Sequence, residues 1–206
     1  MNDVTCVIRE KRHFKVTLDE TDTFLVPWSL FEERPLSEGD TVDGEEYKNW
    51  LTVHQYRYAM KVAGDYLSKS GHSSRDVYDR ILRAGCLPDT AELVVYKLQQ
   101  LGYLNDAEYA AAIIASRTGR QYGKNRIRME LRRKGLDEET AREALENTDE
   151  DILRENAAAL AEKLLHKHRG EEPFNARRKV LAALVRRGYS WDEAKEAVES
   201  VKTDEE

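Results

Sequence analysis

A repeat of about fifty residues constrains the fold of this chain more than any other feature. Gly85, Gly135 and Gly188 each follow a segment with helix-like apolar spacing, and they stand 50 and 53 residues apart. Similar apolar residues recur four positions before, and one, six and ten positions after, each glycine: Ile81, Leu131 and Leu184; Cys86, Leu136 and Tyr189; Ala91, Ala141 and Ala194; Val95, Leu145 and Val198. Such a period predicts tandem supersecondary units that pack on one another.

The helix signals divide each unit into three. Apolar residues follow a helical period from about Val53 to Val201, and Ser73, Asp137, Asn175 and Ser190 stand where helix N-caps are expected. Ser190 belongs to a capping-box pattern, with a glutamate three residues later. We therefore predict a mainly α fold of nine helices in three tandem three-helix repeats, which together form an elongated, curved body.

The first fifty residues have a different pattern. Apolar and β-branched residues alternate over Val4–Ile8 and Phe14–Leu18, and a third short apolar run ends at Pro27. Polar turns separate these runs, and Trp28, Leu30 and Phe31 are expected to form a small apolar lid. The predicted domains are an N-terminal β-hairpin module (1–52), repeats at 53–104, 105–148 and 149–202, and an acidic tail (203–206).

Composition limits the cellular setting. The chain has no run of 18 apolar residues, which a membrane-spanning helix requires, and no secretory signal is visible at its N-terminus. Its two cysteines, Cys6 and Cys86, cannot build a disulfide framework. We expect a cytoplasmic protein with no membrane partner.

Charge is unevenly distributed in this chain of net charge −6. Basic residues gather in the middle helices of the second and third repeats, and a repeated basic face predicts a stripe that contacts a phosphate backbone or an acidic protein groove. The arginines of the first repeat are interspersed with Asp76 and Asp79, which weakens the pattern there. The candidate contact residues are Arg117, Arg120, Lys124, Arg126, Arg128, Arg132, Arg133, Lys134, Arg177, Arg178, Lys179, Arg186 and Arg187.

Signatures of catalysis are weak. Gly119-x-x-x-Gly123-Lys124 resembles part of a phosphate-binding loop, but its spacing is one residue short and Asn125 replaces the required Ser or Thr. His166 and His168 stand two apart on a predicted helix, so they face different directions and cannot share a metal ion. We predict a non-enzymatic protein with no catalytic residue, metal or other cofactor.

The order of the motifs resembles the RecX family of bacterial recombination regulators. Residues 98–110 are similar to the family stretch L-x-x-x-G-Y-L-(N/D)-D-x-x-(F/Y)-A, and residues 123–136 to G-x-x-R-I-x-x-E-L-x-x-K-G-(I/V). Residues 179–190 are similar to the third-repeat motif L-x-R-R-G-(Y/F)-S. The resemblance extends from about Gln55 to Val201, in order and with consistent spacing.

This resemblance implies a function that spacing alone does not show. RecX-like proteins bind the RecA nucleoprotein filament and reduce its ATP hydrolysis, co-protease function and strand exchange, and some also bind single-stranded or duplex DNA. The implied mode of action is that of a regulatory protein in DNA repair, recombination and the SOS response, and we expect a monomer. Residues expected to act as turns, caps and helix stops are Gly102, Asp106, Gly123, Gly135 and Gly188.

Three other classes of function stay open from the sequence. The chain can be a sequence-tolerant DNA-binding module that acts without RecA, a nuclease, or a helical scaffold for an unrelated partner. The segment Ser70-Gly71-His72 lacks the basic residue often found there in the family, which puts a contact by the first repeat in doubt.

Overall fold

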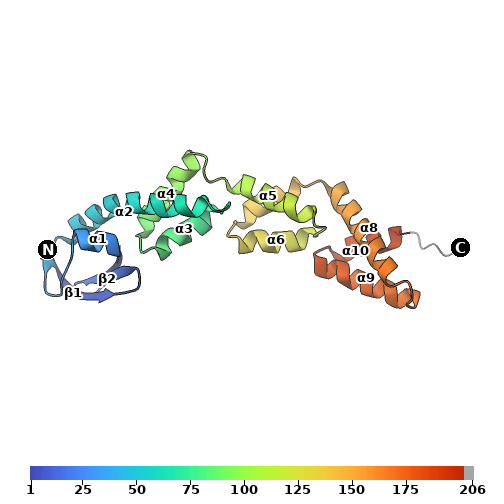
Figure 1. Ribbon diagram of the computed structural model, residues 1–206, viewed down its shortest axis with the longest axis horizontal. Coiled ribbons are helices and arrows are strands. Elements are labelled where there is room, and N and C mark those ends of the chain that lie inside the picture. Colours follow the sequence, from blue (N-terminus) through green and yellow to red (C-terminus); the bar gives the residue numbers. More distant parts are fainter. Residues whose placement is uncertain (202–206) are drawn as a thin grey trace. The chain divides into compact units, whose positions relative to one another are not determined.

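The computed structural model describes residues 1–201 and divides the chain into two compact units, residues 1–105 and 106–206. The first unit begins with a four-stranded antiparallel sheet in the order β3-β2-β1-β4 (Figure 1). Its strands are β1 (Asn2–Arg9), β2 (His13–Leu18), β3 (Asp22–Pro27) and the short β4 (Thr41–Val42). The predicted alternation is confirmed in β2, where Val16 and Leu18 lie in the core below this sheet. In β1 it is wrong beyond Val4, because a bulge between Val4 and Cys6 shifts the register, so that Val7 packs on the core and Ile8 is exposed.

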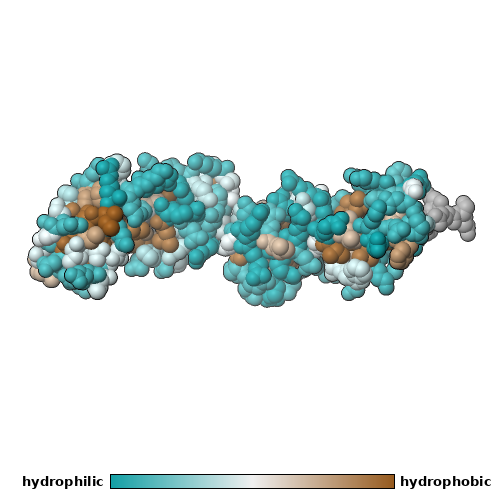
Figure 2. All heavy atoms as spheres, turned by 90° about the horizontal axis from the view of Figure 1, so that it is seen from below, coloured by the Kyte–Doolittle hydropathy of each residue, from teal (hydrophilic) through white to brown (hydrophobic). Residues whose placement is uncertain are grey.

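Ten helices follow one another in the described residues. Three-helix groups are formed by α2–α4, α5–α7 and α8–α10, each around its own apolar core. Hydrophilic residues cover most of the face shown in Figure 2 in both units. The helices are α1 (Trp28–Glu33), α2 (Gly44–Leu67), α3 (Ser74–Arg83), α4 (Pro88–Gln100), α5 (Asp106–Thr118), α6 (Lys124–Arg133), α7 (Glu138–Glu146), α8 (Glu150–Lys167), α9 (Pro173–Arg187) and α10 (Trp191–Ser200).

Three of the four equivalent positions of the predicted repeat are buried in all three groups, whereas at the fourth Val95 is only partly buried and its neighbour Val94 lies in the core. Ile81, Leu131 and Leu184 have no exposed surface, and the three alanines six positions after the glycines are also fully buried. Gly85 and Gly188 end their helices with positive φ angles of 92° and 102°. After each, the next N–H donates to the carbonyl five residues back, which closes the helix end in the Schellman arrangement. The fifty-residue repeat is therefore a repeat of structure.

The beginning of the first three-helix group differs from the prediction. Helix α2 starts at Gly44 rather than near Val53, because Asp43 accepts a hydrogen bond from the Glu46 N–H and caps it. Tyr47 and Leu51, on the first turns of α2, pack under the sheet, whereas Ala59 and Ala63 pack against α3 and α4. One continuous helix thus serves both cores, and position 52 lies within it.

Two further details correct the sequence-based prediction. The expected apolar lid is the short helix α1, in which Leu30 and Phe31 are buried, but Trp28 is 42% exposed and lies beneath the Arg9 guanidinium instead. Helix α9 is capped by Glu172, which accepts from the N–H groups of Phe174 and Asn175, rather than by Asn175 itself. Pro173 then occupies the first helical position, where its missing N–H costs nothing. The predicted caps Ser73, Asp137 and Ser190 are confirmed. The predicted acidic tail, 203–206, lies outside the described residues.

Candidate functional site

Helix α6 presents a basic outer face in the second three-helix group. Ile127 and Leu131 point into the core, so the opposite side of the helix carries Arg126, Met129 and Arg133 at a spacing of three and four residues. Met129 is 73% exposed, although it is a large apolar side chain. Neither arginine forms an ion pair within the described residues, although Arg133 lies near enough to Glu130 to help lower the pKa of its carboxyl. The result is an apolar side chain between two available guanidinium groups.

Helix α9 presents a comparable face in the third group. Its inner side buries Ala176, Val180 and Leu184, and its outer side carries exposed apolar and basic residues at helical spacing. Phe174 is 70% exposed and Val185 is 40% exposed. We call these two surfaces the basic faces. They consist of Arg126, Met129 and Arg133 on α6, and of Phe174, Arg178, Val185 and Arg186 on α9.

Helices α6 and α9, which carry the two basic faces, come into contact where α6 begins and α9 ends. The Gly123 N–H donates to the Arg187 carbonyl at 3.2 Å, and the Asn125 N–H donates to the Gly188 carbonyl at 3.0 Å. A β-carbon on Gly123 would lie 2.4 Å from the backbone of Gly188, so only glycine allows this approach. Two segments that are far apart in the sequence thus form one rigid backbone junction.

Tyr122 is the side-chain centre of this junction. The Arg187 guanidinium lies 4.1 Å from the centre of the Tyr122 ring, and that of Arg126 lies 4.6 Å from it. Arg187 also donates to the backbone carbonyls of Arg120 and Gln121. Arg187 therefore joins the two three-helix groups of the second unit, a role that the sequence did not reveal.

Several other candidate contact residues are engaged within the unit. Arg117 forms a two-bond pair with Glu130, and both side chains are mostly buried. Hydrogen bonding to Arg117 lowers the pKa of the Glu130 carboxyl below its ordinary value, and the same pairing raises the pKa of Arg117. Lys124 pairs with Glu150, Arg132 with Glu138 and Lys179 with Glu171.

Six candidate arginines form no ion pair in the described part of the chain. They are Arg120, Arg126, Arg128, Arg133, Arg178 and Arg186. Five of the six are exposed. Arg128 is partly buried and donates a long hydrogen bond of 3.4 Å to the side-chain oxygen of Asn125. Lys134 and Arg177 are also exposed. Four of the six belong to the basic faces.

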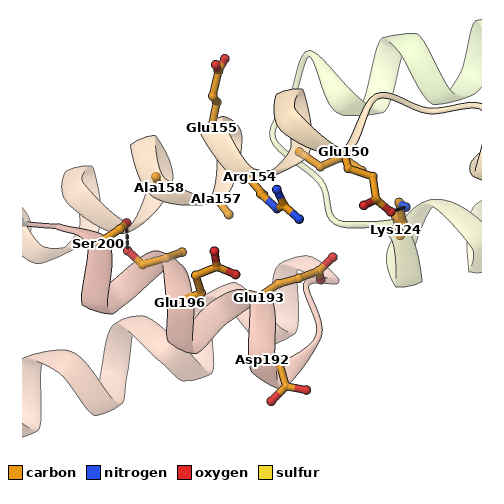
Figure 3. A pocket seen from close by; sticks show the side chains of 12 residues that line it. Lys124, Glu150, Arg154, Glu155, Ala157, Ala158, Asp192, Glu193, Glu196 and Ser200 are labelled. Carbon is orange, nitrogen blue, oxygen red and sulfur yellow. Dashed lines mark hydrogen bonds and ion pairs between the residues drawn. The ribbon is translucent and has the colours of Figure 1, made fainter.

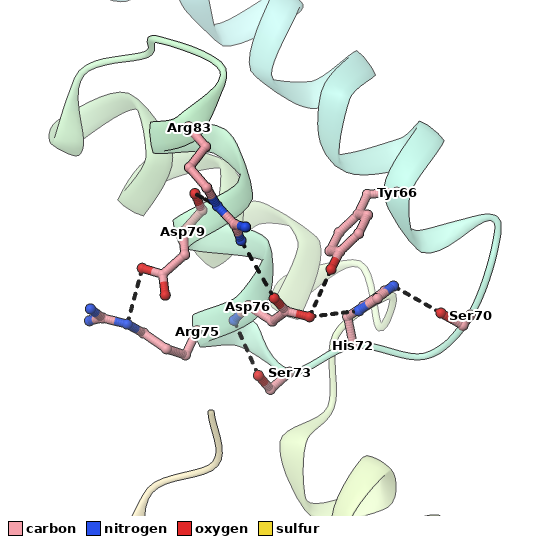
Figure 4. A network of polar contacts seen from close by, with 8 residues as sticks. All are labelled: Tyr66, Ser70, His72, Ser73, Arg75, Asp76, Asp79 and Arg83. Atoms are coloured by element: carbon pink, nitrogen blue, oxygen red, sulfur yellow. Dashed lines mark hydrogen bonds and ion pairs between the residues drawn. The ribbon is translucent and has the colours of Figure 1, made fainter. Parts of the chain in front are cut away.

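Helix α3, the corresponding middle helix of the first unit, differs because two of its arginines form ion pairs with aspartates of the same helix. Arg75 pairs with Asp79, and Arg83 contacts both the Asp79 carbonyl and the Asp76 carboxylate (Figure 4). Asp76 also accepts from the Tyr66 hydroxyl at 2.9 Å and lies 2.7 Å from His72. These contacts neutralise much of the basic charge on α3. The expectation that the first repeat has a weaker basic face agrees with this network.

The third helix of each group in the second unit is acidic. In a helix-turn-helix protein the third helix of such a bundle enters the major groove, where basic and polar residues reach bases and phosphates. Here α7 carries Glu138, Glu139, Glu143 and Glu146 with Arg142, and α10 carries Asp192, Glu193, Glu196 and Glu199 with Lys195. This charge disfavours DNA recognition of the helix-turn-helix kind.

A metal centre has no candidate among residues 1–201. No group of three potential ligands gathers in a geometry that holds a metal ion there. Cys86 is buried, and desolvation raises the pKa of its thiol to about 12, so it stays protonated at neutral pH. Within the same residues, no helix is long and apolar enough to cross a membrane. The basic faces are therefore the candidate site.

Comparison with known proteins identifies the family. Residues 105–145 match the model of the second three-helix domain of RecX, and residues 150–198 match that of the third. The regulatory protein RecX of Bacillus licheniformis is 30% identical over 193 residues, which span 92% of this chain and 68% of that protein. The chain belongs to the RecX family. The Streptococcus gordonii relative, also named regulatory protein RecX, is 27% identical over 98% of this chain and 78% of its own length.

Solved RecX structures share the fold. A crystal structure of regulatory protein RecX matches with a TM-score of 0.65 and 23% identity, over 97% of this chain and all of that one. RecX from Lactobacillus salivarius matches with a TM-score of 0.68 and 24% identity, over 71% of this chain and 96% of that one. At this identity the likeness concerns the fold alone.

Proposed function

We propose that this protein regulates the RecA recombinase, without enzymatic activity of its own, by binding along the RecA nucleoprotein filament in the cytoplasm. It thereby reduces ATP hydrolysis, co-protease function and strand exchange, and so modulates DNA repair and recombination. Family membership supports a regulatory role. The observation that carries the choice of site is the pair of basic faces, whose arginines form no ion pair within the described chain.

The composition of these faces favours a protein partner. Protein interfaces are enriched in arginine, methionine and aromatic residues, whereas phosphate contacts need only cations and polar groups. Met129 and Phe174 are each at least 70% exposed and lie beside arginines. Burial of these apolar side chains against a partner would remove them from water and so favour binding. An acidic groove with apolar positions is the complementary surface that we propose on the filament.

The proposed mechanism is the bridging of neighbouring RecA protomers. Gly123 and Gly188 hold the two three-helix groups of the second unit in backbone contact, so that both basic faces belong to one compact unit. A compact unit that contacts two protomers opposes the subunit motions that accompany ATP turnover, because any such motion breaks one of the contacts. The same bridging can instead favour disassembly of the filament.

The first test is single-stranded-DNA-dependent ATP hydrolysis by the host RecA, with this protein titrated in. Inhibition at substoichiometric ratios that added DNA does not relieve supports action on the filament. Absence of any effect on ATP hydrolysis contradicts the proposal, and tight binding to naked DNA in that case points to a module that acts without RecA.

Charge reversal tests the site. Arg126→Glu, Arg133→Glu and Arg186→Glu in one variant should raise the concentration needed for half inhibition by about tenfold or more, because three favourable charge interactions become repulsive. The matched control replaces Lys163, Lys167 and Lys195 with Glu, which gives the same charge change on α8 and α10. Full inhibition by a folded basic-face variant would overturn the assignment.

Sequence-tolerant DNA binding is the second candidate. Its supporting observation is Tyr122 between Arg126 and Arg187, since aromatic and cationic side chains together can bind single strands. Affinity for naked DNA that falls steeply with salt, and that the charge-reversal variant loses, is the result expected of this candidate.

A further inference from the structure

A groove of about 490 Å³ lies between helices α1 and α2 of the first unit, which carries no part of the basic faces. Helix α1 lies alongside α2 (Figure 1), and a groove of this volume accepts several side chains of a partner. The lining residues are Ser29, Leu30 and Glu33 on α1, and Val53, His54, Arg57, Tyr58 and Lys61 on α2.

The apolar part of this lining is formed by Leu30, Val53 and Tyr58. Leu30 is buried and Tyr58 is half-buried, but Val53 is 70% exposed although it is a large apolar side chain. Beside them, the His54 ring stacks on Trp50 at 4.7 Å between ring centres, and its Nδ1–H donates to the Trp50 carbonyl. The groove therefore offers apolar surface next to an imidazole ring of fixed orientation.

The cations that line the groove have no countercharge from the chain itself. Arg57 and Lys61 are exposed, and within the described residues neither forms an ion pair or a hydrogen bond with an acidic side chain. They stand four positions apart on one helix, where like charges repel each other. Burial raises the pKa of the Tyr58 phenol, and the nearby charges of Arg12 and Arg80 oppose that rise, so further positive charge lies close by.

The carboxylate of the lining does not cancel this charge. Glu33, at the end of α1, forms no ion pair with Arg57 or Lys61, and the two cations outnumber it. The hollow between α8 and α10 in the second unit differs, because Arg154 of the chain extends there toward the carboxylates of α10 (Figure 3). The positive charge of the α1–α2 groove thus stays available for an anionic partner.

We propose that the α1–α2 groove docks an acidic, amphipathic segment of a protein partner, one whose carboxylates lie one helical turn apart beside an apolar side chain. The carboxylates pair with Arg57 and Lys61, which are themselves one turn apart, and the apolar side chain covers Val53. A nucleic acid is disfavoured because its backbone is charged at every nucleotide, whereas a peptide can place a neutral residue opposite Glu33.

The test is fluorescence anisotropy of a short labelled helical peptide that carries glutamates four residues apart on one face and leucines on the other. The protein is the full chain with the charge-reversed basic faces described above, which no longer attract the peptide, and its folding is checked by circular dichroism. Adding Arg57→Glu and Lys61→Glu should weaken binding by about tenfold or more, because attraction becomes repulsion.

The matched control for this double variant is Lys69→Glu with Lys97→Glu. Both residues are exposed and belong to the first unit, but neither lines the groove. The control makes the same charge change and should bind the peptide as the background protein does. Equal loss of binding in the two double variants would mean charge attraction without a site, and would overturn the proposal.

Two single variants test the groove with other signs and other chemistry. Glu33→Gln should strengthen binding several-fold because it removes a repulsive charge, whereas Glu32→Gln, beside it but outside the lining, should change binding little. Val53→Ala should weaken binding several-fold and keep the helix intact, since alanine is the better helix former. Unchanged binding in both Glu33→Gln and Val53→Ala would show that the peptide binds elsewhere.

Competition tests the class of partner. A peptide of the same composition with its glutamates spread around the helix should bind about tenfold more weakly, and equal binding of the two peptides would contradict an amphipathic occupant. Single-stranded oligothymidylate should displace the amphipathic peptide poorly. If it displaces the peptide at equal concentrations of phosphate and carboxylate, a protein segment is the wrong occupant. No RecA is present in these assays, so their failure leaves the proposed function untouched.

Discussion

Gly123 and Gly188 bring the two three-helix groups of the second unit into backbone contact. Their roles differ, because Gly188 has a φ of +102° that favours glycine, whereas Gly123 has an ordinary φ of −79°. Gly123 is therefore required only for space. The resemblance to a phosphate-binding loop at this position reflects a packing contact between helices.

Gly123→Ala should lower the free energy of unfolding by about 1–3 kcal/mol, because the added methyl group meets the Gly188 backbone at 2.4 Å and forces the helices apart. Thermal unfolding followed by circular dichroism measures the change. Gly170→Ala is the control, since a β-carbon there has no neighbour within 4 Å. Equal stability of the two variants would show that the junction is looser than described.

At the scale of elements, α6 has two sides with different tasks. Its outer side carries the basic face, and its flank carries Glu130, which holds Arg117 of α5. An arginine that pairs with a mostly buried carboxylate contributes to stability and is withdrawn from binding. The sequence placed Arg117 among the contact residues because spacing cannot show which distant carboxylate faces it.

Glu130→Gln should reduce stability by about 1–3 kcal/mol at neutral pH, because a charged hydrogen-bonded pair is lost. The pKa of Glu130 is lowered in the folded state, so its stabilisation is complete above the ordinary glutamate pKa of 4.5 and disappears as pH falls through the folded-state value. The difference between the variant and the unmodified protein should therefore shrink in acid. Urea unfolding at several pH values measures it, and Glu162→Gln, at an exposed site, should show little pH-dependent difference.

At the scale of the whole molecule, the chain consists of two units with separate cores. The first contains the sheet with its core and the first three-helix group, and the second contains the other two groups. The basic faces and the Tyr122 junction both belong to the second unit. The contacts proposed with the filament thus need only residues of this half.

A fragment of residues 106–206 should fold by itself into a helical protein with a cooperative thermal transition. Gly123→Ala should lower its midpoint about as much as it lowers that of the same transition in the full chain, since each kcal/mol corresponds to roughly 4–8 °C for a domain of this size. Circular dichroism of the two proteins provides the comparison. An unfolded fragment, or a substitution without effect in it, would contradict the division into units.

The sequence by itself determined what depends on neighbouring residues. Helix periods, the capping residues Ser73, Asp137 and Ser190, and the glycine stops are local, because each hydrogen bond that closes a helix end joins residues a few positions apart. The alignment of the three repeats also located core residues, because residues at matching positions, such as Ile81, Leu131 and Leu184, are buried in the same way. The start of α2 at Gly44 was missed, although Asp43 and Glu46 were visible, because the adjoining turn residues obscured the cap.

The tertiary structure alone decided how the charges are used. Whether an arginine is available depends on which carboxylate or carbonyl, often tens of residues away, lies beside it. Arg187 reaches the carbonyl of Arg120 and Lys124 reaches Glu150. Both therefore differ from Arg186, which forms no ion pair or hydrogen bond with an acidic residue in the described chain.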